Sequence, residues 1–177
     1  MARRSKSSGR WLQEHFNDPY VQRAKSEGWR SRAVYKLEEI DKKERLLKPG
    51  AFCLDLGAAP GAWSQYAARK VGEKGRVIAT DILPMDGLNG VEFVQGDFRE
   101  EPVVAQIVAL VAGGQVDVVL SDMAPNLSGI AIADAARVEH IIDLAIEFAR
   151  AHMKPSGSLL VKCFNGTGFS QLVEKFR

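Results

Sequence analysis

The chain has 177 residues, 46% of them hydrophobic, and a formal net charge of +2 at pH 7. This length and composition fit one domain with a substantial hydrophobic core. No apolar run approaches the roughly 20 residues of a membrane span, and the basic N-terminus lacks the apolar segment of a signal peptide. We therefore expect a cytoplasmic protein with no membrane partner.

Cysteine and histidine usage gives no indication of a metal centre. Cys53 and Cys163 both lie in apolar runs, which is typical of buried thiols in a reducing compartment. The three histidines are scattered, at positions 15, 140 and 152, without the spacing of metal ligands. We expect no metal site.

The charge is distributed unevenly along the chain. Residues 1–50 hold 13 Lys/Arg against 7 Asp/Glu, whereas residues 51–177 hold 11 against 15. Such an excess of basic residues indicates an anionic partner, most commonly nucleic acid. For residues 1–9 the alternative is a solvated tail. The segment 23–36 interleaves Trp29 and Tyr35 with cations, a mixture suited to phosphate contact and base stacking.

We therefore predict that residues 1–30 form a basic RNA-binding extension, with Arg30 and Arg32 among the RNA-binding residues. Helices and strands are expected to alternate along the chain. The predicted elements are helices at 10–16 and 31–44, a strand at 52–56, a helix at 63–70, strands at 76–80 and 91–94, a helix at 99–111, a strand at 116–120, a helix at 131–153, a strand at 158–164 and a helix at 166–177. This rhythm predicts an α/β fold with a doubly wound, mainly parallel sheet.

A loop of small residues follows the first predicted strand and precedes a helix. Its glycines and alanines let the backbone approach a ligand closely, and Gly61 lies just before the helix. Asp81, twenty positions after Gly61, ends the second strand, where an acid typically holds ribose hydroxyls. The sequence therefore predicts a nucleoside-containing cofactor at this loop. The alternative is an ordinary strand–turn–helix corner.

The loop is not of the G-x-G-x-x-G type that binds dinucleotides. Pro60 removes one N–H donor, and the bulky Trp63 follows it. Asp55 adds a negative charge that repels phosphate and suits a cation. These features favour S-adenosylmethionine, which is cationic, bears ribose and lacks phosphate, over a nicotinamide cofactor.

Polar residues also end the remaining predicted strands. In open α/β sheets ligands bind beyond the carboxyl ends of the strands, so Asp122 and Lys162 should share one crevice. The alternatives are a lysine that extends to solvent along an apolar strand and an aspartate that caps a turn. Asp97 is placed to meet an adenine amino group, or alternatively to cap the helix near Arg99.

Together these segments resemble the FtsJ/RrmJ (RlmE) family of ribosomal RNA 2′-O-methyltransferases over nearly the whole chain. The segments that carry the resemblance are residues 10–16, 30–33, 35–37, 55–61, 63–66, 95–99 and 121–126. The resemblance implies that S-adenosylmethionine contacts Gly61, Trp63, Asp81, Asp97 and Asp122. It implies a catalytic set that includes Lys36, Asp122 and Lys162.

The resemblance also implies methylation of a uridine ribose in the A loop of 23S rRNA, within the large ribosomal subunit. A ribose 2′-hydroxyl becomes a good nucleophile when a base removes its proton. We expect Lys162 to be that base, with Lys36 as a neighbouring cation that favours its neutral form and Asp122 as the group that orients it.

The family's final catalytic glutamate has no counterpart here, because Glu174 does not match its position and the chain stops fifteen residues after Lys162. The last strands of a methyltransferase sheet are missing too. We therefore expect residues 31–177 to be a C-terminally incomplete methyltransferase domain from a longer protein, and we expect a monomer. Three alternatives remain: a small-molecule methyltransferase, a non-catalytic RNA-binding or ribosome-assembly protein, and a nicotinamide dehydrogenase.

Overall fold

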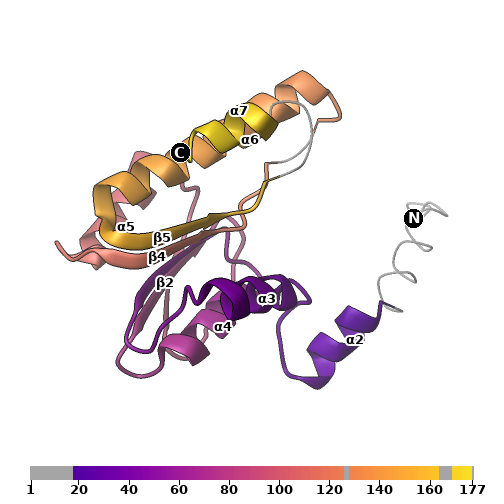
Figure 1. The fold of residues 1–177 in the computed structure, drawn as a ribbon, viewed down its shortest axis with the longest axis vertical. Coiled ribbons are helices and arrows are strands. Elements are labelled where there is room, and N and C mark those ends of the chain that lie inside the picture. Colours follow the sequence, from indigo (N-terminus) through magenta and orange to yellow (C-terminus); the bar gives the residue numbers. More distant parts are fainter. Residues whose placement is uncertain (1–17, 126–127, 164–168, 177) are drawn as a thin grey trace, which may run out of the picture.

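The protein is described by a computed structural model that covers residues 18–125, 128–163 and 169–176. Five parallel strands form a single sheet in the order β3-β2-β1-β4-β5 (Figure 1). The strands are β1 (Phe52–Leu56), β2 (Arg76–Asp81), β3 (Val91–Gln95), β4 (Val116–Ser121) and β5 (Met153–Val161). The order reverses between β1 and β4, which is where doubly wound sheets bind ligands.

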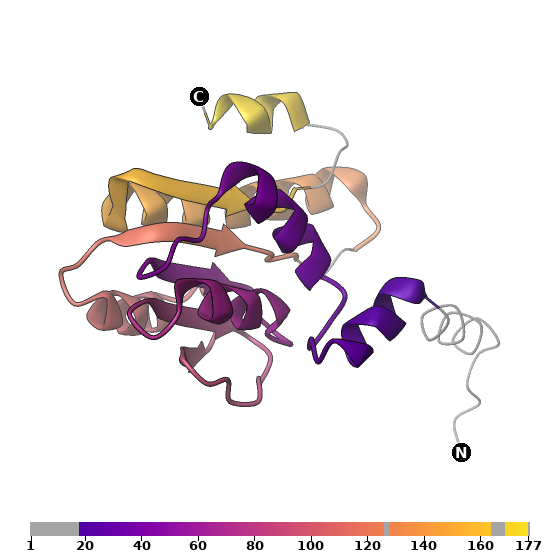
Figure 2. The same cartoon turned by 60° about the horizontal axis from the view of Figure 1, so that its bottom comes forward.

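Helices cover both faces of the sheet. On one face lie α3 (Val34–Glu44) and α4 (Ala62–Val71), and on the other lie α5 (Glu101–Val111) and α6 (Ala131–His152) (Figures 1 and 2). The short helix α7 (Phe169–Glu174) packs beside α6. The predicted α/β, doubly wound parallel fold is thus confirmed.

The two faces of the sheet form two parts of the core, as the alternation of a strand requires. In β1, Cys53 packs with the α3 and α4 side, whereas Leu54 and Leu56 pack with the α5 and α6 side. All three side chains are fully buried. Burial also raises the pKa of the Cys53 thiol well above its usual range, which leaves it an unreactive core residue.

Strand β5 begins at Met153, five residues before the predicted start at residue 158. The sequence through Pro155 and Gly157 reads locally as a turn. The structure instead extends it, because Lys154 Nζ forms an ion pair of 2.7 Å with Asp117 Oδ1 on β4. A tertiary ion pair and the ladder to β4, with one register shift, therefore override the local turn signal.

The N-terminal part also differs from expectation. The predicted helix at 10–16 lies outside the described residues, and a helix that we did not predict, α2 (Pro19–Ser26), follows it. Its signal was present: Asp18 accepts a hydrogen bond from Tyr20 N at 2.8 Å, and Pro19 begins the helix. Figure 2 shows α2 on the side toward which the strand arrows point.

Aromatic residues connect α2 and the segment that follows it to the rest of the domain. Glu27 accepts hydrogen bonds from Tyr35 Oη at 2.9 Å and Trp29 Nε1 at 3.1 Å. Guanidinium groups lie over both rings, that of Arg23 at 4.4 Å from Tyr35 and that of Arg69 at 4.1 Å from Trp29. Both aromatic side chains considered above for base stacking therefore have partners within the chain: Tyr35 of α3 contacts α2, and Trp29 contacts α4.

Across residues 18–125, 128–163 and 169–176, no helix has the length and apolar character needed to cross a lipid bilayer. The same part of the chain holds no group of three or more metal-ligating side chains.

Candidate active site

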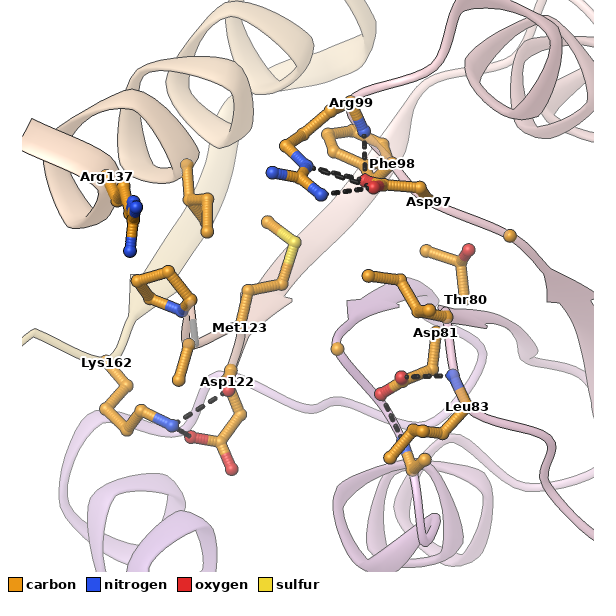
Figure 3. A pocket seen from close by; sticks show the side chains of 17 residues that line it. Thr80, Asp81, Leu83, Asp97, Phe98, Arg99, Asp122, Met123, Arg137 and Lys162 are labelled. Atoms are coloured by element: carbon orange, nitrogen blue, oxygen red, sulfur yellow. Dashed lines mark hydrogen bonds and ion pairs between the residues drawn. The ribbon is translucent and has the colours of Figure 1, made fainter. Parts of the chain in front are cut away.

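A cavity of about 750 Å³ opens at the carboxyl ends of the strands (Figure 3). Its volume lies within the range of small-molecule and cofactor sites. Four of its lining residues follow or end different strands: Gly57 after β1, Asp81 at the end of β2, Asp122 after β4 and Lys162 after β5. The cavity therefore spans the point where the strand order reverses.

The loop after β1 is held by the neighbouring strands. Gly57 N and Ala58 N donate to Thr80 O at 2.9 and 3.0 Å. Gly57 has a φ of +77°, and a Cβ on it would lie 2.8 Å from the backbone of Met123. Only glycine fits this position without displacing the loop after β4.

Asp81 joins the loops that follow β1 and β2. Its carboxylate accepts hydrogen bonds from Ala59 N at 2.9 Å and from Leu83 N at 2.8 Å (Figure 3). Each carboxylate oxygen can accept a second hydrogen bond. The side chain is therefore fixed by the backbone while it retains acceptor capacity toward the cavity.

Asp97 forms a forked ion pair with Arg99 at the cavity wall (Figure 3). The guanidinium donates to both carboxylate oxygens at 2.5 to 3.0 Å, and Arg99 N donates at 2.9 Å. These hydrogen bonds lower the pKa of Asp97. Because α5 begins at Glu101, with Glu100 as its cap, the structure excludes Asp97 as the N-cap of this helix.

Asp122 and Lys162 face each other at the opposite side of the cavity (Figure 3). Lys162 Nζ lies 2.5 Å from Asp122 Oδ1 and donates to Asp122 O at 2.8 Å. The two side chains are 28% and 21% exposed, so the pair is partly desolvated but accessible. The lysine is thus turned into the crevice rather than along the sheet edge to solvent.

Three other predicted site residues are not among those that line this cavity. Lys36 is exposed in the first turn of α3, and it is not one of the described residues that line the cavity. The Trp63 side chain is only 4% exposed, and its Nε1 donates to Ala33 O at 2.9 Å. Gly61, with a φ of +104°, packs against Arg30 and Met85.

Arg30 and Arg32, predicted to bind RNA, both have partners within the chain. Arg30 donates to three backbone carbonyls, those of Pro60, Asp86 and Gly87, at 2.7 to 3.1 Å. Arg32, whose side chain is about half exposed, pairs with Asp18. Their contact with RNA stays a prediction.

Asp55 has a different character from the one that the sequence suggested. It is fully buried, and Ser64 Oγ donates to its Oδ2 at 2.5 Å. Its Oδ1 has no hydrogen-bond partner among the described residues. Burial, helped by the charges of Asp122 and Asp81 and opposed by Ser64, raises its pKa to about 7. Near neutral pH it is therefore only partly ionised, and its attraction for a cation is weaker than expected.

Sequence reasoning missed several lining residues. Ile82, Phe98 and Met123 supply apolar surface, and Arg137 reaches the cavity from α6. The first three are sequence neighbours of the strand-end residues already singled out, so their place at the cavity could have been predicted from the sequence. The place of Arg137 could not have been predicted, because helical periodicity does not tell which face of α6 contacts the loops.

The comparisons with known proteins agree with this geometry. The family model described as FtsJ-like methyltransferase matches residues 29–177. A protein of Burkholderia thailandensis named ribosomal RNA large subunit methyltransferase E is 56% identical over 179 residues, which cover 94% of this chain and 81% of that protein.

Two solved structures show the same fold. The chain is similar to a ribosomal RNA methyltransferase from Plasmodium falciparum, with 28% identity and a TM-score of 0.76 over 83% of this chain and 85% of that one. It is also similar in fold to Aeropyrum pernix fibrillarin, solved with natively bound S-adenosyl-L-methionine. That match has 17% identity and a TM-score of 0.55 over 73% of this chain and 56% of that one.

Proposed function

The chain belongs to the FtsJ-like methyltransferase family, and we propose that it methylates ribosomal RNA with S-adenosylmethionine as the methyl donor. The acceptor we propose is the 2′-hydroxyl of a uridine ribose in 23S rRNA, within the large ribosomal subunit. The observation that carries this proposal is the Asp122–Lys162 pair, which faces Asp81 and Asp97 across one cavity at the strand reversal.

The residues that line the cavity fit this cofactor. Asp81 has acceptor capacity for ribose hydroxyls, and Ile82, Phe98 and Met123 offer apolar surface to an adenine ring. Asp97 would accept from the adenine amino group, sharing its carboxylate with Arg99. The buried Oγ1 of Thr80 has no hydrogen-bond partner among the described residues, as expected where a ligand supplies one. When bound, S-adenosylmethionine supplies an electrophilic methyl group.

Lys162 is the base in this proposal, and Asp122 orients it. The Asp122 carboxylate lies 2.5 Å from Lys162 Nζ, in the orienting role that the sequence analysis gave it. As the base, the Lys162 amine accepts the proton that leaves the ribose hydroxyl. We keep Lys36 as a third catalytic residue, whose exposed side chain in α3 would meet bound RNA.

The N-terminal residues 1–30 are proposed as the RNA-binding extension of a monomeric methyltransferase domain, residues 31–177. The basic excess in residues 1–50 and the position of α2 at the carboxyl-end side of the sheet support this (Figure 2). Such a substrate would place the protein in the cytoplasm, with the ribosomes.

The test is methyl transfer from labelled S-adenosylmethionine to large ribosomal subunits that lack the modification. The chain offers a matched control, because another lysine, Lys154, lies near the start of β5 and pairs with Asp117 of β4, at the other end of these strands from Lys162. We expect label on a uridine 2′-oxygen with the wild type and Lys154→Ala. We expect none with Lys162→Ala, which should still bind S-adenosylhomocysteine.

Two outcomes would contradict the proposal. Wild-type turnover in folded Lys162→Ala would remove the assignment of Lys162 as the base. Cofactor and RNA binding by the wild type without any labelled product would favour a non-catalytic RNA-binding protein with this fold.

A further inference from the structure

Arg30 lies outside the cavity, yet it joins two loops whose other ends form the cavity wall. We propose that Arg30 is a positioning residue: the main role of its guanidinium is to hold the two cofactor-binding loops in place. The inference rests on the S-adenosylmethionine site proposed above.

One guanidinium group connects three carbonyls on two loops. Nη1 donates to Pro60 O at 3.1 Å and to Asp86 O at 2.7 Å, and Nη2 donates to Gly87 O at 2.8 Å. Pro60 belongs to the loop after β1, whereas Asp86 and Gly87 belong to the loop after β2. The flat, rigid fork of arginine suits this arrangement, whereas lysine offers a single nitrogen.

The backbone of Arg30 is itself anchored to a helix. Arg30 N donates to Gln65 Oε1 at 3.1 Å, and Gln65 Nε2 donates to Gly28 O at 2.8 Å. Gln65 lies in the first turns of α4, whose N-terminal side is continuous with the loop after β1. The guanidinium is therefore held from a fixed point.

The loop after β2 has little burial of its own to hold it in place. Ile82 and Leu83, which line the cavity, are 57% and 62% exposed. Further along, Met85 packs onto Gly61, where a Cβ would lie 2.7 Å from Met85 Sδ and 3.0 Å from Arg30 Nη1. The hydrogen bonds of Arg30 thus secure the outer ends of both loops, while Asp81 secures the ends nearest the cavity.

The test measures cofactor affinity without RNA, so that RNA contacts have no part in it. We compare wild type, Arg30→Lys and Arg30→Gln by calorimetric titration with S-adenosylhomocysteine. Arg69→Gln is the matched control, because it removes an equal charge from an exposed arginine whose guanidinium lies over the Trp29 ring. A second variant, Gln65→Leu, leaves the guanidinium intact and removes its anchor.

We expect Arg30→Gln to raise the Kd roughly tenfold or more, since charge-assisted hydrogen bonds are lost. We expect a smaller increase for Arg30→Lys and Gln65→Leu, and a change within about twofold for Arg69→Gln. In methyl transfer, Arg30→Gln should raise the KM for S-adenosylmethionine, because the loops that hold the cofactor lose the hydrogen bonds of the guanidinium.

The failures are separable. If the wild type does not bind S-adenosylhomocysteine, the proposed function fails. If the wild type binds and folded Arg30→Gln binds within twofold of it, the positioning role is overturned. If circular dichroism shows that Arg30→Gln is unfolded, the test depends on Arg30→Lys and Gln65→Leu. Wild-type affinity for S-adenosylhomocysteine in both of these variants would overturn the positioning role of Arg30.

Discussion

Replacing Asp55 by asparagine should change how the stability of the protein depends on pH. Asp55 is fully buried, and its pKa is raised to about 7 from an ordinary value of 3.8. Between these two values the folded state keeps the proton while the unfolded state releases it. The free energy of unfolding contributed by this group therefore falls as pH rises from about 4 to 7, and it is constant above that range.

The magnitude follows from the width of this window. Each pKa unit corresponds to about 1.4 kcal/mol, so the whole shift amounts to about 4 kcal/mol. The part between pH 5 and pH 8 amounts to about 3 kcal/mol, since the slope ends near pH 7. The Asp55→Asn variant cannot ionise and lacks this loss, although Ser64 can still donate to its amide oxygen.

Denaturant titrations at pH 5 and pH 8 give the free energy of unfolding of the wild type and of Asp55→Asn. The quantity of interest is how the difference between the two proteins changes from one pH to the other. Any constant effect of the amide, such as an unpaired NH2 group beside the position of Oδ1, costs the same at both pH values and cancels. We expect the stability of the variant relative to the wild type to improve by about 3 kcal/mol from pH 5 to pH 8. An unchanged difference would refute the raised pKa of Asp55 and the burial argument behind it.

Two further predictions each depend on one contact in the structure. Gly57→Ala should destabilise the protein by at least about 1–2 kcal/mol, because φ is +77° and the new Cβ meets Met123 backbone; an unchanged melting temperature would contradict the close approach. Tyr66→Phe should cost about 1.5–3 kcal/mol in denaturant titration, since Tyr66 Oη donates at 3.0 Å to the buried Asp41 carboxylate.

The residues that follow the strands could be placed from the sequence alone. Periodicity and turn signals predicted parallel strands, and parallel strands bring their carboxyl ends to one edge of a sheet. That rule is enough to gather Asp81, Asp97, Asp122 and Lys162, and the structure does bring them to one cavity. The motif content of the same segments also led to the family that the comparisons confirm.

Only the tertiary structure decided which partners the other side chains have. Arg30 looked like an RNA ligand because it lies in a basic segment, but its donors meet carbonyls far along the chain. Trp63 turned into the core, and Lys154 held a turn-like segment in β5. The partner of a side chain depends on which loops and helix faces come into contact in the folded protein. Local patterns of hydrophobicity and charge do not determine these tertiary contacts.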